Sequence, residues 1–244
     1  MAGFYEKVFH ALPNSLQRRI HPLDFAIRRL AEEASENSQP EDFVLDAGAG
    51  ESRFGRLFRH CRYLAIDTTL GDSDWDYSAI DVLADLSKIP LKEASIDLVL
   101  NTQVLEHVPD PGRVIREFFR VLKPGGILYL SAPQGWHEHQ QPYDFFRFTT
   151  FSLQQLFREA GFRDYRILPQ GGYFHYLGHR LTYIPKVLFQ GRSGFWRYLF
   201  FPVELLCLGT FCFILPLGCY FLDRFDGKKE FTLGYACRVI KPGS

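Results

Sequence analysis

Three short apolar runs of this 244-residue chain each end on an acidic residue, at Asp46, Asp67 and Asp85. If the runs are parallel strands, these side chains belong at the carboxyl ends of the strands, where functional groups of such sheets gather. Carboxylates accept hydrogen bonds and attract cations. The set therefore suits a ligand that carries hydroxyl and amino donors.

A glycine turn follows the first of these runs and includes Gly48, Ala49 and Gly50. Glycines in such a turn let a ligand approach the backbone closely. A dinucleotide-binding turn would have a third glycine where Arg53 stands, and the chain has no G-K-[ST] phosphate loop. The turn therefore favours a ligand with a cationic or amino-bearing near end, with Asp67 placed to accept from paired ribose hydroxyls. The alternative is that these acids only cap turns or helices.

Elements that would position these residues alternate along the chain. Residues 4–35 have the apolar spacing of one or two amphipathic helices, and helical patterns recur at 52–60, 113–121 and 151–160. Apolar runs between helices predict a parallel sheet covered on both faces. The predicted strands are residues 43–46, 63–67, 80–84, 96–100, 127–131, 163–168 and 235–240.

A set of motifs within residues 40–135 carries a family resemblance. The segments are residues 44–50, 65–67, 84–91, 95–111 and 120–126, in this order. Together they resemble the class I S-adenosylmethionine-dependent methyltransferases, and most closely the subgroup that includes the quinone-biosynthesis methyltransferases. Residues 139–149 also resemble a signature of related bacterial methyltransferases, several from surface-polysaccharide or lipid pathways. The resemblance implies an α/β fold with a Rossmann-like, doubly wound, mostly parallel seven-stranded sheet whose last strand is antiparallel.

The same resemblance implies S-adenosylmethionine as the cofactor. In the family pattern the glycine turn lies at the amino-acid end of the cofactor, Asp67 holds the ribose hydroxyls, and Asp85 meets the adenine amine. The cofactor's donors match acids and carbonyl oxygens. The cofactor-binding residues expected from the resemblance are Asp46, Gly48, Ala49, Gly50, Asp67, Thr68, Asp85, Leu86, Asn101 and Gln103.

His107 and His139 are the predicted catalytic residues, because deprotonating a hydroxyl acceptor requires a base or a metal. The alternative for His107 is that the Glu106-His107 pair orders the loop after the fourth strand. In some quinone-type relatives a Glu-x-x-Glu-His run binds a divalent metal; here Gln103 stands in place of the first glutamate. We therefore expect no bound metal ion.

The segment 139–149 supplies the candidate substrate residues Tyr143, Asp144 and Arg147. A second interpretation of this segment is structural, with a buried pair of Asp144 and Arg147 bracing the cover of the active site.

Composition hides an asymmetry. Lys+Arg and Asp+Glu each number 28, but residues 1–140 hold 15 basic and 21 acidic side chains, so this part carries −6 and the remainder +6. Five cysteines lack disulfide or metal spacing, and the N-terminus lacks the apolar core of a signal peptide, which predicts a cytoplasmic chain. The basic residues are not part of a nucleic-acid motif, so no nucleic-acid partner is expected.

We expect a single methyltransferase domain over residues 1–244. It comprises a helical cap acting as a lid (1–38), the cofactor-binding core (39–169), an apolar insertion (170–230) and a final strand returning to the sheet (231–244). Residues 205–222 of the insertion carry no charge, and this run of eighteen residues is long enough to be a transmembrane candidate. A single crossing, however, would leave the final strand on the wrong side of the bilayer.

Basic and aromatic residues flank this apolar run, which predicts peripheral contact of residues 195–222 with the cytoplasmic face of a membrane. A buried helical cap or a homodimer interface are the alternatives. The predicted function is methyl transfer to a hydroxyl of a lipid, lipid-linked glycan or isoprenoid/quinone-like acceptor. A soluble small-molecule methyltransferase and a non-catalytic cofactor-binding scaffold are the alternatives. The flanking residues are Arg180, Lys186, Arg192, Trp196, Arg197, Tyr198, Arg224, Lys228 and Lys229.

Overall fold

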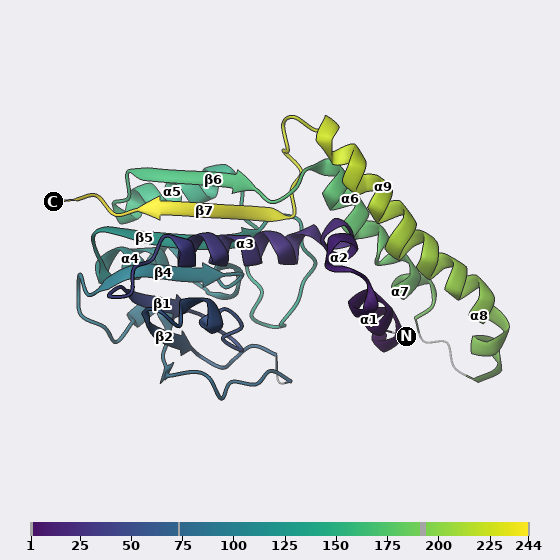
Figure 1. The fold of residues 1–244 in the computed structure, drawn as a ribbon, viewed down its shortest axis with the longest axis horizontal. Coiled ribbons are helices and arrows are strands. Elements are labelled where there is room, and N and C mark those ends of the chain that lie inside the picture. The colour runs from purple at the N-terminus through teal and green to yellow at the C-terminus, as the bar shows by residue number, and fades with distance from the viewer. Residues whose placement is uncertain (1, 73, 191–193, 244) are drawn as a thin grey trace. The chain divides into compact units, whose positions relative to one another are not determined.

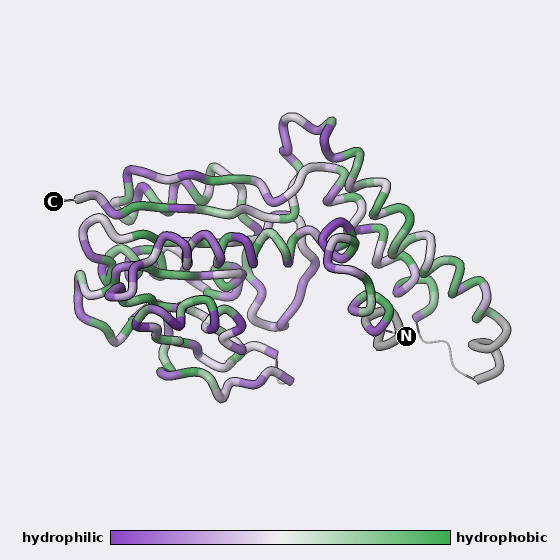
Figure 2. The backbone as a smooth tube through the Cα atoms, in the orientation of Figure 1, coloured by the Kyte–Doolittle hydropathy of each residue, from purple (hydrophilic) through white to green (hydrophobic). Residues whose placement is uncertain are grey.

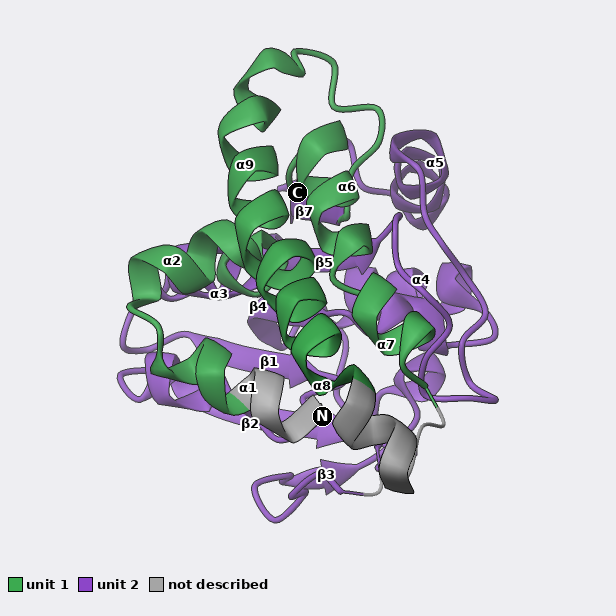
Figure 3. Cartoon of the chain, turned by 90° about the vertical axis from the view of Figure 1, so that its right-hand side faces the viewer, with its two compact units in different colours: residues 1–25, 169–233 green, residues 26–168, 234–244 purple. Residues whose placement is uncertain are grey.

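The computed structural model describes the backbone of residues 2–72, 74–190 and 194–243, and the side chains of these residues except 2–6 and 194–199. Arg192, Trp196, Arg197 and Tyr198, predicted at the edge of the apolar run, lie outside the described side chains. The chain folds into two compact units (Figure 3). We call residues 26–168 and 234–244 the sheet unit, and residues 1–25 and 169–233 the helical unit.

The sheet has seven strands in the order β3-β2-β1-β4-β5-β7-β6 (Figure 1). Strands β1 to β5 pair in parallel, and β7 pairs antiparallel with β5. This confirms the predicted mostly parallel sheet with an antiparallel last strand. The strands are β1 (Phe43–Ala47), β2 (Arg62–Asp67), β3 (Val82–Leu83), β4 (Ile96–Thr102), β5 (Leu122–Pro133), β6 (Asp164–Pro169) and β7 (Gly234–Ile240).

Three long helices cover the sheet. Helix α3 (Pro22–Glu36) lies on one face, and α4 (Pro111–Val121) and α5 (Thr150–Ala160) lie on the other (Figures 1 and 3). The end signals of α4 are local, because Asp110 accepts a hydrogen bond from the Arg113 amide and Pro111 occupies the first turn. The core between these layers is continuous and built mainly from branched aliphatic and Phe side chains, among them Leu45, Ile66, Val99, Leu105, Ile115, Phe118, Leu128 and Phe157.

Two predicted helical segments differ from the structure. The expected helix at 52–60 is a short 3₁₀ turn, η1 (Gly55–Phe58), and Ser52 before it is left-handed, with a φ of 50°. The N-terminal segment forms three helices, α1 (Ala2–Ala11), α2 (Asn14–Ile20) and α3, since Pro13 and Pro22 stand at their junctions. The predicted strand at 80–84 shortens to β3.

The helical unit holds one long apolar helix. It runs through α8 (Gly194–Gly209), a π-helical turn η4 (Thr210–Ile214), α9 (Leu215–Leu222) and η5 (Asp223–Phe225), and is largely hydrophobic along its length (Figure 2). Helix α6 (Tyr173–Leu181) packs against α9, with Gly178 close to Cys219, and α7 (Ile184–Leu188) follows. Among the described helices, 200–225 is long and apolar enough to cross a membrane by length and composition, with a mean hydropathy of 2.2.

The glycine turn after β1 is held in a conformation that requires glycine. Gly48 has a φ of 78° and Gly50 a φ of 55°, both in the left-handed region. The amides of Gly48 and Ala49 donate to the Ile66 carbonyl oxygen at 2.8 and 3.1 Å, which ties the turn to β2. A Cβ at Gly48 would lie 2.5 Å from Val104 Cγ1, so the backbone there is both left-handed and closely covered.

We predict that Gly48→Ala lowers the free energy of unfolding by about 2–5 kcal/mol, from left-handed strain and overlap with Val104. Gly125→Ala is the matched control, because Gly125 has a φ of 81° but nothing lies within 4 Å of its Cβ position. It should lose only about 1–2 kcal/mol. Urea unfolding followed by circular dichroism measures both, and equal losses in the two variants would contradict the packing argument.

Candidate active site at the carboxyl ends of the strands

The predicted cofactor residues of the first and fourth strands lie at one edge of the sheet. The strand register places Asp46 between Ala65 of β2 and Leu100 of β4, and Asn101 and Asp67 follow directly along their strands. The Asn101 side-chain amide donates to the Ala47 carbonyl oxygen at 2.7 Å. The parallel topology therefore brings the glycine turn, the acids and the amide together, as expected for strand ends of this architecture.

Asp46 is a buried carboxyl that accepts a hydrogen bond from Tyr63. It is 2% exposed, and the Tyr63 hydroxyl donates to its Oδ2 at 2.5 Å. Burial raises the pKa of Asp46 to about 6, while the Tyr63 hydrogen bond and the charge of Arg53 oppose that shift. A buried carboxylate of this kind is stabilised by any cation that binds beside it.

Asp67 and Asp85 act as local backbone acceptors. Asp67 accepts from the amides of Gly50 at 2.9 Å and Thr69 at 2.6 Å, and Asp85 accepts from the Ser87 amide at 2.7 Å. The capping alternative is thus present at both acids. An ionised carboxylate has about four lone-pair sites, so these bonds leave acceptor capacity on each. Thr68, which directly follows Asp67 in the chain, is exposed.

The remaining predicted cofactor residues differ in burial and in hydrogen bonding. Leu86 is buried in the core cluster. Asn101 is fully buried, and its Oδ1 accepts no hydrogen bond from the described residues. Gln103 has a φ of 55° and its side-chain amide donates to Ser131 Oγ at 2.6 Å. The uncompensated Oδ1 of Asn101 is an acceptor that a ligand donor would satisfy.

Two aromatic residues at this edge were missed from the sequence. Tyr63 lies on β2 and bridges Asp46 to the Ser52 hydroxyl, which is 2.9 Å from its own. Trp75 lies over the glycine turn, since a Cβ at Gly50 would be 3.0 Å from its ring. Tyr63 was detectable as the polar residue in an otherwise apolar strand, but the loop that carries Trp75 has no pattern that places it.

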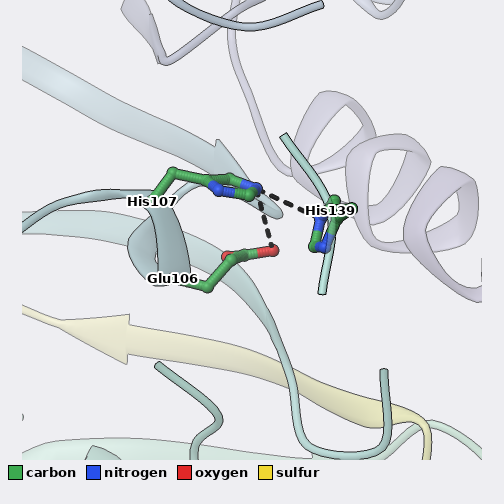
Figure 4. A group of neighbouring side chains, drawn as sticks. All are labelled: Glu106, His107 and His139. Atoms are coloured by element: carbon green, nitrogen blue, oxygen red, sulfur yellow. Dashed lines mark hydrogen bonds and ion pairs between the residues drawn. The ribbon is translucent and has the colours of Figure 1, made fainter. Parts of the chain in front are cut away.

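A second cluster follows β4, at the turn η3 (Leu105–His107). Glu106, His107 and His139 converge there, although His139 comes from the loop after β5 (Figure 4). The two Nε2 atoms are 3.2 Å apart, and His107 Nε2 is 3.8 Å from Glu106 Oε1. The structure thus brings together both predicted catalytic histidines.

Glu106 is a carboxyl without a hydrogen-bonding neighbour. Its residue is fully buried, and neither oxygen accepts a hydrogen bond from another described residue. Burial raises the pKa of Glu106 to about 8, and burial lowers the pKa of His107 below its ordinary value. The sequence analysis considered Glu106 as a loop-ordering residue and as part of an incomplete metal motif, and gave no sign of its burial.

Asp144 and Arg147 pair with each other. Arg147 donates to both Asp144 carboxylate oxygens at 2.7 Å, and Asp144 Oδ2 also accepts from the His139 amide at 2.8 Å. The Arg147 guanidinium holds the pKa of Asp144 well below its ordinary value. The guanidinium also donates to the carbonyl oxygens of Trp136 and His137. The pair therefore braces residues 136–147, as the structural alternative required; contact of Tyr143, Asp144 or Arg147 with a substrate remains a prediction.

Comparisons with known proteins agree with this arrangement. Residues 45–130 match the methyltransferase domain family. The chain is 32% identical over 147 residues to a probable S-adenosylmethionine-dependent methyltransferase of Mycolicibacterium smegmatis, covering 55% of this chain and 56% of that protein. The chain thus spans about half the length of this curated relative. The matches do not single out the quinone-biosynthesis subgroup.

Solved structures share the fold. A methyltransferase from Archaeoglobus fulgidus superposes with a TM-score of 0.56 at 14% identity, covering 89% of this chain and 94% of that one. A Burkholderia thailandensis 1,6-didemethyltoxoflavin-N1-methyltransferase, solved with S-adenosylhomocysteine, gives a TM-score of 0.51 at 18% identity, covering 89% and 78%. At these identities the likeness is one of architecture.

The residues at the strand ends fit S-adenosylmethionine, the cofactor of this family. Its ammonium would satisfy the buried Asp46 carboxylate and the Asn101 oxygen. Motifs, sheet order and donor chemistry agree with this match, so residues 45–130 form a methyltransferase domain similar to that of S-adenosylmethionine-dependent relatives.

Proposed function

We propose that this chain transfers a methyl group from S-adenosylmethionine to a hydroxyl of a lipid, lipid-linked glycan or isoprenoid/quinone-like acceptor at a membrane surface. The observation that carries the transfer step is the strand-end site, where a glycine turn, a buried carboxylate and an uncompensated amide oxygen meet. The choice of acceptor is supported by the apolar helix 200–225 and its basic flanks.

Bound S-adenosylmethionine supplies a methyl group on a positively charged sulfur. Its transfer would leave the electron pair of the methyl–sulfur bond on sulfur, and the hydroxyl proton of the acceptor would pass to a base, for which His107 and His139 are the candidates. The residues of this chain bind and orient. We propose that Asp46 and Asn101 receive the amino-acid end, that Asp67 accepts from the ribose, and that His107 and His139 face the acceptor. Alignment and exclusion of water provide much of the rate in such reactions.

Asp46 gives the cofactor site a pH dependence. Its pKa is about 6, so the carboxylate loses its charge as the pH falls through 6, and with it the attraction for the cofactor ammonium. We expect S-adenosylhomocysteine, which keeps that ammonium, to bind about tenfold more weakly at pH 5 than at pH 7.5 by titration calorimetry. Asp46→Asn should bind weakly at both pH values; a variant with the wild-type pH profile would contradict this role.

The outer surface of the apolar helix supports membrane contact. Leu206 is 70% exposed and Ile214 66% exposed, whereas Glu204 and Asp223, acids of the same helix, are 6% and 4% exposed. A helix that exposes its apolar side chains and buries its acids suits a lipid environment. The exposed apolar set is Phe201, Val203, Leu205, Leu206, Ile214, Leu215, Phe221, Leu222 and Phe225.

The connections of the helix favour docking over crossing. Strands β6 and β7, which precede and follow the helical insertion, are neighbours in one sheet. Both ends of the insertion must therefore stay on the same side of a bilayer. Lys186, Arg224, Lys228 and Lys229 are described basic residues near this helix, and cations of this kind are attracted to anionic headgroups.

Flotation with vesicles tests the docking surface. We expect the chain to float with vesicles that contain anionic phosphatidylserine. Leu206→Glu with Ile214→Glu should reduce bound protein at least tenfold, because two exposed apolar side chains that would enter the lipid are replaced by charges. Phe151→Glu is the matched control, since Phe151 is 79% exposed on α5 of the sheet unit. Absence of flotation together with a stable dimer in analytical ultracentrifugation would instead assign this face to a second copy.

Labelled transfer tests the acceptor class separately. Radiolabelled S-adenosylmethionine is incubated with the chain and either a lipid extract or an aqueous extract. The proposal expects the label in the lipid fraction. Label only in the aqueous fraction would favour a soluble small-molecule acceptor, and cofactor binding without transfer into either extract would favour a non-catalytic scaffold.

A further inference from the structure

Three atoms with free lone pairs converge at η3. They are a ring nitrogen of His107, a ring nitrogen of His139 and a carboxylate oxygen of Glu106. His107 Nδ1 lies 2.6 Å from the Tyr143 carbonyl oxygen, which can only accept, so Nδ1 carries the proton. His139 Nδ1 lies 3.1 Å from the His137 carbonyl oxygen and 3.3 Å from an Asp144 carboxylate oxygen, again acceptors only. In both neutral rings the lone pair is therefore on Nε2.

These two lone pairs face each other. The Nε2 atoms are 3.2 Å apart, a hydrogen-bond distance at which neither neutral ring offers a proton. The Glu106 carboxylate, fully buried and without a hydrogen bond from another described residue, lies 3.8 Å from His107 Nε2. Three lone pairs that face one another are unfavourable unless a cation, either a proton or a metal ion, lies between them.

We propose that Glu106, His107 and His139 bind a divalent transition-metal ion, with Zn²⁺ the best match. Two imidazole nitrogens at about 2.05 Å from a tetrahedral zinc are about 3.3 Å apart. The observed 3.2 Å agrees with this spacing, and all three ligand atoms lie within 4.8 Å of one another. A set of two histidines and one carboxylate is typical of sites that keep an open coordination position.

Outer contacts of the ligands also have the form expected of a metal site. In each histidine the Nδ1–H group donates a hydrogen bond to a carbonyl or carboxylate oxygen, which fixes the orientation of the ring and its tautomer. The two segments that supply the ligands are held together, because the Phe145 amide donates to the Glu106 carbonyl oxygen at 2.8 Å and Asp144 holds the His139 amide. The ligands are thus oriented before any ion arrives.

This site replaces the expectation that the chain binds no metal. That expectation depended on Gln103, which stands where quinone-type relatives have a glutamate, whereas His139 comes from a different segment and fills the ligand set. His107 and His139 are half-buried rather than sealed, which leaves room for an oxygen ligand. In transfer, which depends on the proposed function, the ion would bind the acceptor hydroxyl and favour loss of its proton.

Zinc titration of the metal-depleted full chain tests the site directly. Titration calorimetry is expected to show one Zn²⁺ per chain, and Co²⁺ in its place should give the visible absorption of a four-coordinate ion. His139→Gln and Glu106→Gln should each weaken Zn²⁺ binding at least tenfold, since removal of even an outer-shell partner has that effect. His137→Gln is the matched control, because His137 is an exposed histidine of the same loop and should leave the affinity unchanged.

Two results would overturn the site: no stoichiometric Zn²⁺ binding to the wild-type chain, or equal binding by the His139→Gln variant. Circular dichroism of each variant confirms that the chain remains folded. The Zn²⁺ titration contains no S-adenosylmethionine, so a metal site that binds while labelled transfer fails would leave the metal assignment intact and reject only the proposed function.

Discussion

The ion pair between Asp144 and Arg147 fixes the part of the site that no helix or strand supports. Residues 136–147 cross the end of the sheet as an irregular segment, and their backbone carbonyl oxygens need donors from elsewhere. Arg147 donates to three of those carbonyls, at Trp136, His137 and Phe146, and to Asp144. Asp144 in turn accepts from the His139 amide. The position of His139 opposite His107 follows from these bonds. Replacement of either charge would leave the other buried and unpaired, which costs several kcal/mol.

Buried polar groups at the strand ends are unfavourable for the empty protein and favourable for binding. The carboxylates of Asp46 and Glu106 and the Asn101 oxygen are removed from water with fewer partners than they can accept. Burial raises the pKa values of Asp46 and Glu106, because the charged form of each carboxyl is unfavourable away from water. A ligand with a positive charge relieves that cost on binding. The stability that these groups withhold from the free chain therefore appears as affinity, the trade common at functional sites.

Sequence patterns predicted the sheet but only part of the site. Parallel strands have a strong local signal, because an apolar run ending on a polar residue is visible without knowledge of its neighbours, and Asp46, Asp67 and Asn101 were placed in this way. The convergence of His139 with His107 depends on side-chain pairing across 32 residues and was not visible. Gln103 led to the expectation of no bound metal ion, because a motif compares residues along the chain, whereas the proposed site joins residues from two segments. The apolar pattern of residues 52–60 predicted a helix and gave no sign of the 3₁₀ turn η1 or of the left-handed Ser52 before it.

The helical unit inverts the usual relation between charge and burial. An amphipathic helix of a water-soluble protein buries its apolar stripe and exposes its charges. Here Asp223 is buried because it accepts from the amides of Gly172 and His175 at the start of α6, so its charge serves the inside of the unit. The outer surface keeps large apolar side chains such as Leu206 and Ile214. In water such a surface is costly by about 25 cal/mol per Å² left exposed, and this cost is the physical basis of the membrane contact proposed for the helix.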